Sequence, residues 1–170
     1  MELEQLMRRI DRIAGGRQAH LRIAPAALHH PRTRRDFRWI TWILTAELVI
    51  GAAAVGIAVW LTVQGHPVAM SAWMRAVVVL GMTATLFYFF YFALRAAAGW
   101  RWAYQRLRLF AQVFPVITLV LAAVPGLYPV WMVTEQIVFS LLMIGVGDIL
   151  TSDHMREAYR HPDRPVPRFE

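Results

Sequence analysis

The stretch WITWILTAELVIGAAAVGIAVWLTV, residues 39–63, decides the fold, because it is a long apolar run interrupted by a single carboxylate, Glu47. At a helical rise of about 1.5 Å per residue, this run can cross a hydrocarbon core of about 30 Å with some tilt. A carboxylate inside hydrocarbon costs several kcal/mol unless it is protonated or paired. The stretch therefore predicts a transmembrane helix and marks Glu47 as a residue that needs a structural or functional reason.

The composition of the whole chain supports a membrane protein. Of 170 residues, 58% are hydrophobic and only 17% are charged, and the apolar residues lie in long blocks. All 18 basic residues are arginine, which is typical of a GC-rich bacterial genome. The absence of cysteine excludes disulfides, thiol catalysis and cysteine-bound zinc or iron–sulfur clusters.

Three further apolar runs follow the first, separated by the turn signals QGHP and PGLYP and by an arginine-rich connector. We therefore predict an all-α, polytopic membrane protein with a cytoplasmic N-terminal arm, a four-helix domain and a cytoplasmic tail. The expected domains are 1–38, 39–150 and 151–170, with spans at about 39–63, 72–94, 109–127 and 130–150.

The distribution of arginine predicts the orientation in the membrane. Nine arginines precede the first span, four lie in the central connector and four in the tail, so seventeen of the eighteen fall on one side. The positive-inside rule then places both termini in the cytoplasm, in a bacterial inner membrane. The same distribution accounts for the net charge of +7 without nucleic acid, which we do not expect as a partner.

The two cytoplasmic arms are predicted to contact lipid or protein. Residues 1–14 have the apolar spacing of an amphipathic helix, which would lie on anionic lipid, dock on a protein or form no stable helix at all. The tail is polar and contains three prolines in its last residues, and we expect it to end as an extended arm. Anionic headgroups are the expected partners of the inner-surface arginines, which are Arg32, Arg34, Arg35, Arg38, Arg101, Arg106 and Arg108.

Counting helical rise from the inner ends places hydroxyl side chains at the depth of Glu47. We predict an intramembrane polar layer of Glu47, Thr85, Thr118 and Ser140. One reading is a protonatable carboxylate in a proton or cation pathway. The other is a neutral acid that is hydrogen-bonded to its neighbours and helps to specify helix packing. Gly51, Ala54 and Ala58 lie on the same helical face as Glu47, which favours its burial in a bundle.

A second acid, Glu135, lies near the outer end of the last span, at about the depth of Arg75 in the second. We predict an outer-leaflet ion pair, as a structural clamp or, alternatively, as a gate or headgroup site.

The residue inventory indicates a non-catalytic protein. No span contains histidine for a haem, lysine is absent, and the chain lacks the G-x-S-x-G and H-E-x-x-H motifs. We expect no cofactor and no metal, because the spacing of Asp153, His154 and Glu157, which could suggest a metal site, is common on exposed helices. The remaining histidines are expected to be solvated. The favoured function is a small membrane subunit that assembles with itself or with a larger complex, and the alternative is an oligomeric proton or cation channel or transporter that uses Glu47.

Overall fold

A computed structural model describes residues 21–66, 69, 73 and 91–160. Within these residues the fold is all-α, and three helices are long and apolar enough to cross a membrane. The chain is therefore a multi-pass membrane protein. The predicted second span falls almost entirely outside the described residues, as does the predicted N-terminal amphipathic helix, so four spans are not shown.

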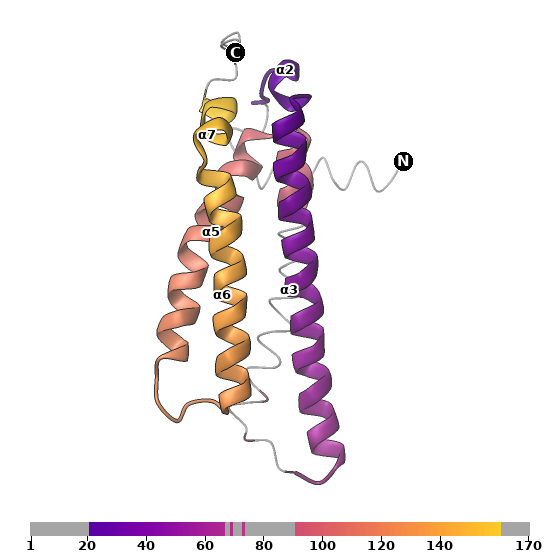
Figure 1. The fold of residues 1–170 in the computed structure, drawn as a ribbon, viewed down its shortest axis with the longest axis vertical. Coiled ribbons are helices and arrows are strands. Elements are labelled where there is room, and N and C mark those ends of the chain that lie inside the picture. Colours follow the sequence, from indigo (N-terminus) through magenta and orange to yellow (C-terminus); the bar gives the residue numbers. More distant parts are fainter. Residues whose placement is uncertain (1–20, 67–68, 70–72, 74–90, 161–170) are drawn as a thin grey trace.

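The described helices are arranged as an elongated bundle (Figure 1). Helix α6 lies between α3 and α5 and packs against both of them. The short helices α2 and α7 lie together at one end of the bundle (Figure 1). The helices are α2 (Pro25–Leu28), α3 (Pro31–Val63), α5 (Arg101–Ala122), α6 (Val130–Thr151) and α7 (Asp153–Arg160).

Helix α3 begins at Pro31, earlier than the predicted start at Trp39. Proline suits the first turn because it has no N–H to leave unsatisfied, and the Nδ1 atom of His30 accepts a hydrogen bond from the backbone N–H of Arg32 at 3.2 Å. With 33 residues, the helix is roughly 50 Å long and exceeds the hydrocarbon thickness. Its arginine-rich first turns therefore extend beyond the membrane as helix.

Helix α5 also begins earlier than predicted. It starts at Arg101, so most of the arginine-rich connector is helical, and it ends at Ala122 before the PGLYP turn. Pro115 lies inside this helix and cannot donate a backbone hydrogen bond to the carbonyl of Ala111. Helix α6 approaches closely at this level: a side-chain carbon added at Gly147 would lie 3.3 Å from the Ala111 oxygen. A small residue at this position allows the two helices to pack closely.

The tail begins with the helix α7, which covers residues 153–160, whereas the end of the tail, where an extended arm is predicted, lies outside the described residues. The chain bends at Ser152, whose ψ of 147° ends α6 before α7 begins. Met155, Ala158 and Tyr159 then bury one face of α7 in the hydrophobic core. Amphipathic spacing over eight residues is a weak signal by itself, and here the burial stabilises the helix.

The described part of the N-terminal arm is joined to the connector by backbone hydrogen bonds. The N–H of Ile23 donates to the carbonyl of Gly99 at 3.0 Å, and Arg22 and Trp100 form an antiparallel bridge. Gly99 has a φ of +88°, and a side-chain carbon there would lie 3.3 Å from Ile23. Glycine is required at this junction both for the left-handed backbone and for the close approach.

Candidate functional site

Glu47 lies on the inner face of α3 and is completely buried. Leu44, Gly51, Ala54 and Ala58 are buried on the same face, as the spacing predicts. Neither carboxyl oxygen of Glu47 has a hydrogen-bond partner among the residues that the structure describes. Within the described residues, Glu47 is therefore a buried acid without the hydrogen bonds that usually satisfy such a group.

Thr118 and Ser140 join α5 to α6 at the centre of the bundle. Their hydroxyl oxygens are 2.7 Å apart, and both residues are buried. The Ser140 hydroxyl also lies 2.8 Å from the carbonyl of Gln136, so either hydroxyl can donate to the other while the second donates to a carbonyl. Thr118 also has the carbonyls of Phe114 and Pro115 within 3.0 Å. The two hydroxyls therefore stabilise each other and the helix that contains Pro115.

The structure assembles part of the predicted polar layer. Thr118 and Ser140 are in contact, but no hydrogen bond joins either of them to Glu47 within the described residues, and Thr85 lies outside those residues. Gln136, which is not among the predicted site residues, lies on the same face of α6 as Ser140. It is buried one turn before Ser140, and its side-chain oxygen has no partner in the described part of the chain.

The predicted Arg75–Glu135 ion pair stays a prediction, because Arg75 lies outside the described residues. Glu135 is half-buried on α6, one residue before Gln136.

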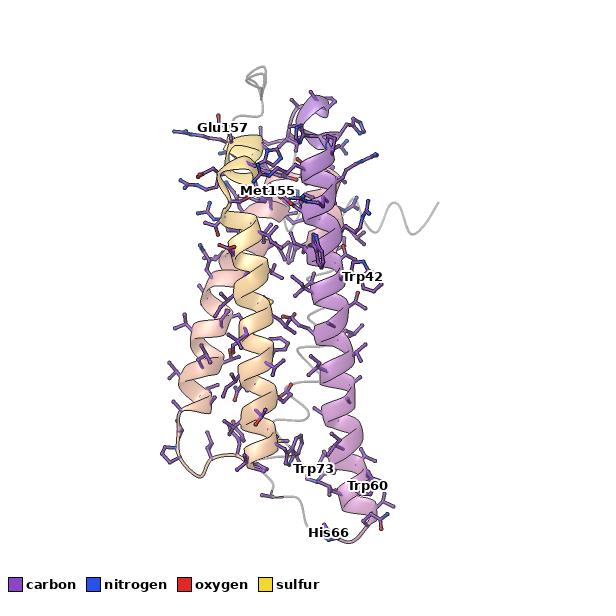
Figure 2. The ribbon with its side chains drawn as sticks, in the orientation of Figure 1. Trp42, Trp60, His66, Trp73, Met155 and Glu157 are labelled. Carbon is purple, nitrogen blue, oxygen red and sulfur yellow. The ribbon has the colours of Figure 1, made fainter. Side chains whose placement is uncertain are left out.

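A pocket of about 720 Å³ lies at the α7 end of the bundle. Five arginines from three helices line it together with two acids and four other side chains. They are Arg32, Arg101, Arg108, Arg156 and Arg160, with Asp153, Glu157, Tyr104, Gln105, His154 and Tyr159. Figure 2 shows Met155 and Glu157 of α7 at this end, opposite Trp60, Trp73 and His66.

The inner-surface arginines predicted from the sequence do not form one group. Arg32, Arg101 and Arg108 line the pocket, whereas Arg34, Arg35, Arg38 and Arg106 do not. Arg106 instead lies over the ring of Trp102, at 5.9 Å from its centroid. Arg156 and Arg160 also line the pocket and are not among the predicted contact residues. Their spacing of four residues places them on one side of a helix, which is the signal that the sequence offers.

Buried polar contacts position α7 against the other helices. The Nε2 atom of His154 lies 2.9 Å from the hydroxyl of Thr33, and its ring centroid lies 4.9 Å from that of His30. Burial lowers the pKa of His154, and the nearby His30 and Arg32 lower it further. His154 is therefore neutral at pH 7 and its ring nitrogen can share a hydrogen bond with Thr33. His154 is buried and His30 is half-buried, so neither side chain is fully solvated.

Two stacked tyrosines form the inner wall of the pocket. The rings of Tyr104 and Tyr159 are 4.1 Å apart and nearly parallel, with an interplanar angle of 11°. The Tyr104 hydroxyl donates to the carbonyl of Leu150, and the Tyr159 hydroxyl donates to that of Ala96, both at 2.6 Å. Burial, and then the neighbouring Tyr104, raise the pKa of Tyr159, so its hydroxyl stays protonated and donates. The wall is therefore fixed in place before any ligand arrives.

Comparison with known proteins adds no relative: no family model, no curated protein and no solved structure matches the chain. Function must therefore be argued from the described side chains alone.

Proposed function

We propose that the protein is a small, non-catalytic subunit of a bacterial inner membrane that assembles with itself or with a larger membrane complex. Both termini would lie in the cytoplasm, where the arginines of α3, α5 and α7 would face anionic headgroups. The second span would then lie within residues 72–94 and complete a four-helix topology.

The observation that carries this proposal is that α3 has small residues on two faces. One face, Gly51, Ala54 and Ala58, is buried within the bundle. Ala52, Ala53 and Gly56 lie on the exposed side, and no atom lies within 4 Å of a side-chain carbon added at Gly56. In lipid, helices associate through small residues that allow backbones to approach closely. An exposed small-residue face on a transmembrane helix therefore favours contact with another helix.

The absence of cysteine makes a direct test possible, because an introduced cysteine has no background. In native membranes under mild oxidation, Gly56→Cys should form disulfide-linked dimers, or cross-links to a partner that also carries an accessible cysteine. Val120→Cys is the matched control, since Val120 is 62% exposed but lies on α5. Mass measurement of the unmodified protein in mild detergent completes the test. A monomeric, partner-free protein, with Gly56→Cys no more reactive than Val120→Cys, would contradict the proposal.

Glu47 favours a second candidate, an oligomeric proton or cation channel or transporter. A fully buried carboxyl without a hydrogen bond in the described residues is the group that a proton-conducting pathway needs at the membrane centre. In proteoliposomes, proton flux should then be lost in Glu47→Gln and retained in Asp148→Asn, which changes an exposed acid near the inner end of α6. Flux that survives Glu47→Gln would exclude the carboxylate as the carrier.

A further inference from the structure

We infer that the pocket between α3, α5 and α7 binds a phosphoryl group, either of an anionic lipid headgroup or of a soluble phosphate compound. This inference concerns a binding site in one chain and does not depend on whether the protein assembles with others.

The charge of the pocket is unbalanced. The Oδ1 atom of Asp153 lies 4.0 Å from Nη1 of Arg156, and Oε2 of Glu157 lies 3.7 Å from Nη1 of Arg160. The two acids of the wall therefore pair with the two arginines of α7. Within the described part of the chain, no acid pairs with the other three arginines of the wall, which are Arg32, Arg101 and Arg108. Three guanidinium groups around one hollow repel one another, and an anion between them would relieve that repulsion.

Arg101 gives a second observation in favour of an anion site. Its Nε atom is buried and has no hydrogen-bond acceptor among the described residues. A buried guanidinium N–H without an acceptor is unfavourable, because burial removes the water that would otherwise accept its hydrogen bond. An anion in the pocket would supply that acceptor once the Arg101 side chain turns its Nε–H toward the pocket.

The chemistry of the wall favours phosphate. Guanidinium groups offer planar pairs of N–H donors that match two oxygens of a phosphate, and several of them together can bind the oxygens of one phosphoryl group. The arginines come from three helices, and the stacked Tyr104 and Tyr159 hold α5 and α7 together behind them. The donors therefore converge on a wall that is already ordered, which reduces the entropic cost of binding.

The size and position of the pocket define the ligand further. A volume of about 720 Å³ is that of a small-molecule site and does not suit a nucleic-acid or protein surface. Arg32 precedes Trp39 and Trp42 on α3, and both tryptophans are exposed, as expected for a membrane-interface anchor. The distance from Arg32 to Trp39 is roughly 10 Å along the helix, which places the pocket at headgroup depth. A lipid phosphate and a small soluble phosphate can both reach it.

The test uses the full chain in two arms. In the first, calorimetry measures binding of inorganic pyrophosphate to the protein in phosphatidylcholine nanodiscs. In the second, the nanodiscs contain a fraction of phosphatidylglycerol, and native mass spectrometry counts the lipid that stays bound after release into detergent. Each arm compares the unmodified protein with Arg108→Gln and Arg101→Gln. For pyrophosphate binding, Arg38→Gln is the matched control, because it removes the same charge from an exposed position of α3 outside the pocket.

We expect Arg108→Gln and Arg101→Gln to weaken binding by about tenfold each, which is typical of one lost charge-assisted hydrogen bond. In the pyrophosphate arm, Arg38→Gln should change the affinity by less than about twofold. If the two pocket variants bind pyrophosphate more weakly than the unmodified protein, the site is assigned to a soluble phosphate. If they lose only bound phosphatidylglycerol, the site is assigned to a lipid headgroup. No binding in either arm, or equal weakening by Arg38→Gln, overturns the inference, because the arginines would then act only as a diffuse charge. Arg108 is half-exposed, so its variant remains informative if Arg101→Gln fails to fold.

Discussion

Replacing Glu47 by methionine should stabilise the protein. The side chain is completely buried, and neither of its oxygens has a hydrogen-bond partner in the described residues. An unsatisfied buried polar group costs about 1–3 kcal/mol, and methionine fills a similar volume without polar atoms. We therefore expect the free energy of unfolding of Glu47→Met to rise by about 1–3 kcal/mol.

The assay is equilibrium unfolding of the detergent-solubilised protein, followed by circular dichroism over a denaturant series. Leu44→Met is the matched control, because Leu44 is also completely buried and lies one turn earlier on the same face of α3. This volume-conserving exchange should cost less than about 1.5 kcal/mol and should not stabilise. Glu47→Gln keeps the shape and the polarity, so it should leave stability within about 0.5 kcal/mol of the unmodified protein.

A Glu47→Met variant that is less stable than the unmodified protein would refute the reasoning. It would show that the carboxyl makes a favourable hydrogen bond or ion pair in the folded protein. A stabilised variant that also loses proton flux would instead indicate that the chain keeps an unfavourable acid for transport, since functional groups are commonly retained at a cost in stability.

Three further predictions concern the helix contacts. Thr118→Val and Ser140→Ala should each destabilise the protein by about 1 kcal/mol. Because the two hydroxyls share the 2.7 Å hydrogen bond, a double-mutant cycle should give a coupling energy of about 0.5–1.5 kcal/mol. Additive losses of stability would contradict the contact. Gly147→Leu should lower the melting temperature and reduce the unfolding free energy by about 1–3 kcal/mol or more, because even a single added carbon would lie 3.3 Å from the Ala111 oxygen. An unchanged melting temperature would contradict the close packing of α5 and α6. Burial lowers the pKa of His154 below its ordinary value of 6.5, so the unfolded chain takes up the proton first on acidification. The unfolding free energy should therefore fall as the pH decreases through about 6.5 and stay level above it. This pH dependence should vanish in His154→Gln, and a rise in stability on acidification would contradict the burial of His154.

The local features of the fold could be predicted from the sequence because each rests on neighbouring residues. Apolar runs longer than a bilayer is thick must form helices, and the turn signals set their ends at Val63 and Val130. The burial of Glu47 followed from the small residues at i+4, i+7 and i+11 on its face. The helix starts were predicted too late, because arginine-rich turns outside the hydrocarbon are also helical, and hydropathy reports only the part of a helix that lies in lipid.

The site at the α7 end depended on contacts between residues far apart in the chain. The sequence alone determined that the chain crosses a membrane more than once, that its arginines gather at one end of its helices, and that an acid lies among small residues in the first span. Only the tertiary structure decided that Tyr159 stacks on Tyr104, that His154 meets Thr33, and that α7 thereby carries Arg156 and Arg160 to a pocket with three other arginines. The physical reason is that a polar eight-residue segment has too little intrinsic helicity to define its own position, and burial against distant partners supplies it.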